Sequence, residues 1–317
     1  MRMVRYAVFE PPQSARPGPI LRSSAILDSG IDPTHPAFAG LVHDTNYQDF
    51  TGTALADTIG HGTHCAGIIF GRDVDNRRIG IARGVGDVLI AKVADRDATT
   101  TTSELEQALL WAVRKGADII SMSVGLDFLG HARALVNDGM PQDQALTLAL
   151  SDYQAYGRFF DRLMAMVINS GVAGKSALVI AAAGNESQAG ETPSYRVMAT
   201  LPAAAEGVVA VGAVARGGNG KFAVAPFSNE GVNVCAPGVA ILSAKPAGGF
   251  ATMSGTSQAA PHVAGLAALW AEKLRTEGGS PPTPESVKEH LLGHADRSGI
   301  DPKVRVGEMG EGLAGAP

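Results

Sequence analysis

The 317-residue chain has few cysteines, no excess of basic residues and no long apolar run. Two cysteines cannot form the disulfide framework of a small secreted protein. A formal net charge of −5 leaves no basic stripe, which argues against a nucleic-acid partner. No segment approaches the roughly 20 apolar residues that cross a bilayer, so we expect no membrane partner. We also find no internal repeat and no dinucleotide-binding fingerprint.

The composition suits one large folded domain. Hydrophobic residues make up 45% of the chain and charged residues only 18%, which is enough apolar sequence to fill an α/β core. The 39 glycines suit tight turns and close packing of helices on a sheet.

Ser257 lies between a tight turn and an apolar helix in the segment 255–265, GTSQAAPHVAG. In the first turn of a helix the backbone N–H groups lack helical acceptors and carry the positive end of the helix dipole. An oxyanion formed beside Ser257 would therefore be stabilised. Buried helices often begin with small residues too, so a catalytic interpretation needs further groups.

Two upstream segments supply such groups. Residues 24–28, SAILD, predict a buried parallel strand that ends at Asp28. Residues 61–69, HGTHCAGII, predict a second helix with His61 in its first turn. A serine nucleophile needs a base, and the base needs an acid that orients it. Asp28, His61 and Ser257 can fill these roles.

The three motifs, in the order Asp, His, Ser, resemble those of the subtilisin-like serine proteases, or subtilases. The matching motifs are DSG at 28–30, HGTH at 61–64 and GTS at 255–257 followed by Pro261-His262. The similarity runs from about residue 23 to about residue 270. It implies an α/β endopeptidase with a mostly parallel central sheet, helices on both faces and polypeptide substrates.

The resemblance also assigns an oxyanion-hole residue. Asn185 follows an apolar strand predicted over 179–183 and matches the asparagine of the family. Spacing alone would make it an ordinary turn residue at a strand end. Beside the other motifs, we expect its side-chain amide to bind the oxyanion together with the Ser257 N–H.

A peptide substrate would bind as an added β-strand. The resemblance places one edge of this strand against Ser123, Val124 and Gly125, and the other against Thr100. The primary specificity pocket would be lined by small groups, with room for a large apolar side chain and an acid at its rim that accepts a basic one. These residues are Gly125, Ala182, Ala183, Gly184 and, at the rim, Glu186.

We expect no cofactor. Cys65 should be buried beneath His61, and the His61–His64 spacing lacks the glutamate of the zinc motif HExxH. Ala37 stands where the family often has an aspartate that binds structural calcium. A weak calcium site at Asp73, Asp75 and Asn76 stays open.

The chain is unusually long for the family between Ser123 and Asn185. Apolar residues at helical spacing predict an amphipathic helix between Pro141 and Gly171. These residues are Leu146, Leu150, Tyr153, Phe160, Leu163 and Val167. The insertion at about 126–171 is either a surface helix that only packs on the sheet, or a lid or partner-docking element beside the substrate cleft.

Residues 1–22 predict an extended, proline-rich arm ahead of a catalytic domain over 23–317. The N-terminus lacks the apolar core of a secretory signal. If Met1 is the natural start, we expect a cytoplasmic protein.

Two other functions stay open. One is a non-catalytic peptide-binding protein on a subtilase scaffold, against which the complete set of Asp28, His61, Ser257 and Asn185 argues. The other is a dedicated maturation protease or transpeptidase, in which the insertion shields the acyl-enzyme from water. The sequence does not separate broad from dedicated cleavage.

Overall fold

The computed structural model describes residues 23–54, 56–95, 100–170, 172, 174–218, 220–278 and 281–317. The arm predicted over 1–22 lies outside the described residues. The strands are β1 (Ser24–Asp28), β2 (Tyr47–Asp49), β3 (Val88–Lys92), β4 (Ile119–Met122), β5 (Leu178–Ala182), β6 (Val209–Arg216), β7 (Phe222–Val224), β8 (Val234–Pro237), β9 (Ile241–Ala244) and β10 (Phe250–Met253). The helices are η1 (Pro36–Phe38), α1 (His61–Phe70), α2 (Thr102–Lys115), α3 (Phe128–Asn137), α4 (Gln142–Met164), η2 (Ala165–Ser170), α5 (Thr256–Gly278), α6 (Pro284–Gly293) and α7 (Val306–Met309).

The central sheet is mostly parallel, as expected. Its strands follow the order β2-β3-β1-β4-β5-β6-β7, with β8 also paired to β6. Only the β6–β7 pair is antiparallel. A separate antiparallel hairpin is formed by β9 and β10. None of the described helices combines the length and the apolar character needed to cross a membrane.

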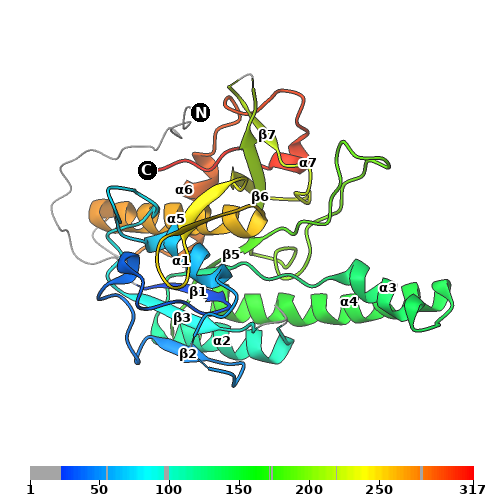
Figure 1. Ribbon diagram of the computed structural model, residues 1–317, viewed down its shortest axis with the longest axis horizontal. Helices are drawn as coiled ribbons and strands as arrows, with labels where there is room; N and C mark the ends of the chain where they lie inside the picture. The colour runs from blue at the N-terminus through cyan, green and yellow to red at the C-terminus, as the bar shows by residue number, and fades with distance from the viewer. Residues whose placement is uncertain are drawn as a thin grey trace.

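Both faces of the sheet are buried. Side chains alternate between the faces along each strand: Ile26 and Ile180 join a core with α1, α5 and α6, whereas Leu27 and Val179 join a second core with α2 and the end of α4. Figure 1 shows α1 and α5 on one side of the strands and α2 on the other. Each central strand is therefore a nearly continuous run of apolar residues, which is typical of parallel strands that are covered by helices on both faces.

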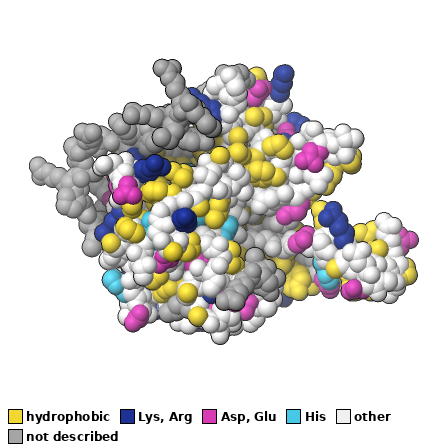
Figure 2. All heavy atoms as spheres, in the orientation of Figure 1, with side chains coloured by type: hydrophobic (Ala, Val, Ile, Leu, Met, Phe, Trp, Pro, Cys, Tyr) yellow, Lys and Arg dark blue, Asp and Glu magenta, His cyan; other side chains and the backbone are white. Residues whose placement is uncertain are grey.

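The insertion forms a helical hairpin. Helices α3 and α4 pack against each other, and Figure 1 shows them projecting from the body of the molecule. Large apolar side chains lie exposed on this α3–α4 hairpin, which is the right-hand lobe of Figure 2. They are Val136, Leu146, Leu148, Leu150 and Tyr156.

The predicted helix is present as α4, but the apolar face predicted for its first half is wrong. Leu146 and Leu150 are 44% and 48% exposed, whereas Ala145 and Ala149 are buried. The sequence pattern did not predict α3, which packs against the first half of α4 along a side of small residues. In the second half the prediction is confirmed, because Phe160, like Leu163 and Val167 beyond it, lies in the second core.

This arrangement predicts different costs for truncation along α4. Phe160→Ala removes a fully buried ring and should lower the free energy of unfolding by about 3–5 kcal/mol. Leu150→Ala, on the same helix but half exposed, should change it by less than about 0.5 kcal/mol. Urea unfolding followed by circular dichroism measures both, and equal losses would contradict the assignment of the two halves.

Candidate active site

Three neighbouring parallel strands bring predicted site residues to one edge of the sheet. Asp28 is the last residue of β1, Ser123 follows β4, and Asn185 follows β5. The pairs β1–β4 and β4–β5 are both parallel, so their carboxyl ends lie together. His61 opens α1 and Ser257 lies in the first turn of α5, and these two helices pack against each other.

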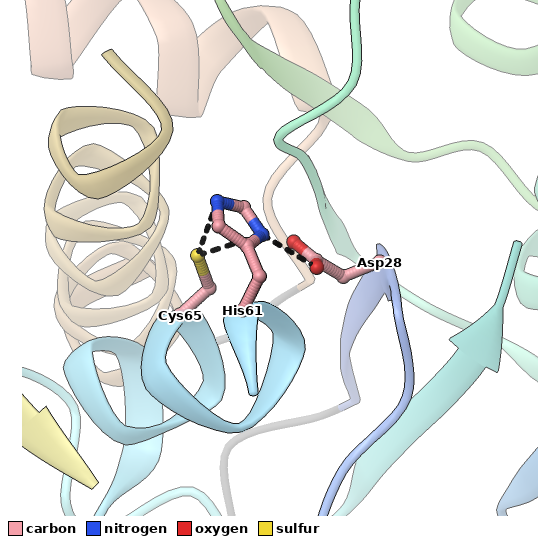
Figure 3. Close-up of side chains that lie close together, drawn as sticks. All are labelled: Asp28, His61 and Cys65. Atoms are coloured by element: carbon pink, nitrogen blue, oxygen red, sulfur yellow. Dashed lines mark hydrogen bonds and ion pairs between the residues drawn. The ribbon is translucent and has the colours of Figure 1, made fainter. Parts of the chain in front are cut away.

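The structure joins Asp28 to His61. Nδ1 of His61 lies 2.7 Å from Oδ1 of Asp28 (Figure 3). The same Oδ1 also accepts the Ser29 N–H at 2.8 Å. The Asp28 side chain is 4% exposed, and its Oδ2 has no hydrogen-bond partner among the described groups. Because Nδ1 donates to the carboxylate, the lone pair of the His61 ring is on Nε2.

Two opposed effects set the pKa of His61. Burial favours the neutral ring, but the charge of Asp28 and its hydrogen bond outweigh burial and raise the pKa well above 6.5. Asp28 therefore stabilises the imidazolium form, which is the form that His61 takes after accepting a proton.

The start of α1 is held to β1 by a carboxylate that the sequence analysis missed. Oδ1 of Asp57 accepts the Ser29 hydroxyl at 2.9 Å and the Gly60 N–H at 2.8 Å, and Oδ2 accepts the Thr63 N–H at 2.9 Å. The Ser29 hydroxyl in turn accepts the Gly62 N–H at 2.9 Å. An acid just before a helix start is a capping signal that could have revealed Asp57.

Cys65 connects His61 to the nucleophile segment. Its Sγ lies 3.9 Å from both ring nitrogens of His61 and donates to the Ser257 carbonyl at 3.3 Å. The Ser123 hydroxyl donates to the same carbonyl at 3.0 Å. Burial raises the pKa of Cys65, so the group stays a thiol. No hydrogen bond joins the described side chains of Ser257 and His61, and such bonds often tighten only when substrate binds.

Asn185 is oriented by the residue before Ser257. Its Oδ1 accepts the Thr256 N–H at 2.8 Å and the Thr256 hydroxyl at 3.1 Å. This leaves the Nδ2 amide group as its donor to a ligand. Among the described groups, the Ser257 N–H has no acceptor either. Two N–H donors are thus available at the start of α5.

The predicted substrate edges border a small hollow. Thr100, Val124 and Gly125 line it, residues that the resemblance assigns to opposite edges of the bound peptide. Leu126 and Phe160, both from the insertion, line it as well. The insertion therefore contributes directly to the surface beside the predicted substrate strand.

The other wall is fixed by a buried asparagine. Ala182 ends β5 and Ala183 follows it, both buried, and Gly184 is partly exposed. Oε2 of Glu186 accepts the Asn229 Nδ2 group at 2.6 Å, and Asn229 is fully buried. No sequence pattern links these two residues, which lie 43 positions apart.

In the loop considered for a weak calcium site, one of the acids is paired with an arginine. Asp73 forms a salt bridge with Arg83 at 2.7 Å, and Asp75 and Asn76 adopt positive φ angles of 51° and 59° in a turn. Within the described chain, the one cluster of three His, Cys, Asp or Glu ligand atoms is Asp28, His61 and Cys65. Independence from calcium stays a prediction.

His61 and Asp28 yield a prediction on titration. The pKa of His61 should lie well above 6.5 in the native protein and fall in Asp28→Asn, because burial, which lowers it, is then opposed only by the contact with Cys65. A raised native pKa stabilises the fold fully below about pH 6.5, and this contribution disappears as the pH rises through the native pKa. NMR titration of the ring checks both values; an unchanged pKa in the variant would contradict the pairing.

Known proteins resemble this chain over most of its length. A model described as the subtilase family matches residues 24–309. A thermophilic serine proteinase of Bacillus sp. (strain AK1) is 34% identical over 258 residues, covering 79% of this chain and 52% of that protein. Thermitase of Thermoactinomyces vulgaris is 31% identical over 275 residues, covering 85% and 81%. The solved structure of the prenylagaramide maturation protease PagA aligns with a TM-score of 0.63 and 30% identity, covering 94% of this chain and 92% of that chain.

Proposed function

Because the chain belongs to the subtilase family, we propose that it is a serine endopeptidase that cleaves polypeptides through Ser257, His61 and Asp28. The chain spans about half the length of some of the relatives it matches. The observation that carries the proposal is the Asp28–His61 hydrogen bond at the sheet edge where α5 presents Ser257.

The geometry supports a definite role for each residue. Ser257 Oγ attacks the scissile carbonyl while His61 Nε2 takes its proton, and Asp28 stabilises the resulting imidazolium. The carbonyl oxygen becomes an oxyanion that accepts hydrogen bonds from the Asn185 amide and the Ser257 N–H. His61 then protonates the leaving amine, and water hydrolyses the acyl-enzyme by the same groups in reverse.

Covalent labelling tests this function. A fluorophosphonate should label Ser257, and Ser257→Ala should abolish both labelling and peptide hydrolysis. Asn185→Ala should keep the fold and lower kcat by about 10²–10³-fold, the loss that removing such a donor causes in subtilisin. Ser151→Ala, on the exposed side of α4, is the control and should behave as wild type. Wild-type protein that binds peptide but takes no label would instead be a non-catalytic binding protein.

A narrower function is favoured by one comparison. The PagA maturation protease aligns over 92% of its chain at 30% identity, with a TM-score of 0.63. This supports processing of a defined precursor rather than general digestion. Mass spectrometry of the products from a peptide library separates the two by the number of sites cut, and ligated products would reveal transpeptidation.

The α3–α4 hairpin is the part of the chain that we propose contacts protein substrates or a protein partner. Two observations support this. Its base lines the hollow beside Thr100 and Gly125 through Leu126 and Phe160, and its outer half exposes apolar side chains.

Polar replacement on the hairpin tests this role without removing buried residues. Leu146→Ser/Leu150→Ser should leave cleavage of short chromogenic peptides unchanged, because neither residue approaches the triad. Relative rates on a panel of protein substrates should change, whereas they should stay constant in the control Gln144→Ser/Gln154→Ser, which alters exposed polar residues of the same helix. Unchanged relative rates in the leucine variant would reduce the hairpin to a structural element.

A further inference from the structure

The backbone carbonyl of Ser257 lies in helix α5 but cannot join the hydrogen-bond ladder of that helix. In an α-helix each carbonyl accepts the N–H of the residue four positions later. That residue is Pro261, which is buried within α5 and has no N–H to donate. Its ring also crowds the carbonyl four positions earlier. To be satisfied away from water, the Ser257 carbonyl therefore needs donors from outside the helix.

Two side chains on other segments supply these donors. The hydroxyl of Ser123, which follows β4, donates to the Ser257 carbonyl at 3.0 Å. The thiol of Cys65, on α1, donates to the same oxygen at 3.3 Å. This oxygen is the nearest acceptor of the thiol, since the other polar contacts of the sulfur are 3.9 Å long. Burial raises the pKa of Cys65, so its sulfur keeps the proton that it donates.

The donors complete the restraint of the peptide group that follows the nucleophile. The N–H of this group belongs to Gln258 and donates to the Gly255 carbonyl at 3.1 Å. Its oxygen is held by Ser123 and Cys65. With both ends held, rotation about the Cα–C bond of Ser257 is restricted, and so is the direction in which the Ser257 side chain leaves the backbone. A nucleophile must be held within reach of its base for proton transfer.

We propose that Ser123 and Cys65 are positioning residues, whose donors replace the helical N–H that Pro261 lacks and thereby hold the Ser257 hydroxyl toward His61. The proposal deepens the proposed function and rests on it. Cys65 lies one helical turn after His61, so its thiol joins the helix of the base to the helix of the nucleophile. Neither side chain exchanges a proton in the reaction, because both act through the position of Ser257.

Removal of the donors is the first part of the test. Ser123→Ala should lower kcat and the rate of fluorophosphonate labelling by about 2–10-fold, the usual effect of one neutral hydrogen bond, and should change KM by less than about twofold. Cys65→Ala should cause no larger loss, since a thiol is a weak donor. Ser123→Ala/Cys65→Ala leaves the carbonyl without either donor and should lose more than the product of the two single losses.

Rescue by Pro261→Ala is the second part, because this change restores an N–H four residues after Ser257. Added to Ser123→Ala/Cys65→Ala, it should recover the labelling rate by at least about threefold. The matched control is Asn185→Ala, whose loss concerns the oxyanion and not the Ser257 carbonyl, and there Pro261→Ala should recover nothing. Circular dichroism checks that each variant folds. If the double variant does not, Ser123→Ala with and without Pro261→Ala carries the test.

The outcomes separate this proposal from the proposed function. Wild-type labelling in Ser123→Ala, a loss confined to KM, a loss that Pro261→Ala does not reverse, or equal recovery in Asn185→Ala each overturns the positioning role alone. A wild-type protein that takes no label overturns the proposed function instead.

Discussion

The site depends on the parallel pairing of β1, β4 and β5. Parallel neighbours end at the same edge of a sheet, so Asp28, Ser123 and Asn185 come together although 157 positions separate the first from the last. A one-residue slip in any of these pairings would turn the strand's apolar side chains to the opposite core. Burial of both faces therefore fixes the register, and the register places the polar groups.

Hydrogen bonds to the backbone then convert this approximate placement into a defined geometry. Asp57 ties the start of α1 to the end of β1, and Thr256 fixes the amide of Asn185. Ser123 and Cys65 hold the Ser257 carbonyl from the other side. Each of these partners restricts a reacting group without taking part in proton transfer. Preorganised groups need little rearrangement when charge develops, which is the main source of electrostatic stabilisation in enzymes.

Much of the fold and of the candidate site could be predicted from the sequence, because the catalytic residue types lie next to short local patterns that define strand ends and helix starts. The strand ending at Asp28 and the helices starting near His61 and Ser257 are all present where short apolar or small-residue runs predicted them. The features that the sequence did not predict depend on contacts between segments that are distant in the chain. Leu146 looked buried because α3 was not expected, and Asn229, which holds Glu186, lay in a loop with no motif. Its position follows only from its hydrogen bonds to Glu186 and Ser187, which are distant from it in sequence.

The α3–α4 hairpin is anchored at one end only, with Phe160 and the following turn in the second core and the turn at 138–141 distant from the sheet (Figure 1). Changes in length at that turn would leave every strand contact intact, and exposed turns of this kind tolerate insertions well. The turn is therefore a natural point for evolutionary divergence among related chains. It is equally suited to carry a fluorophore or an affinity tag that reports on the enzyme without touching its cleft.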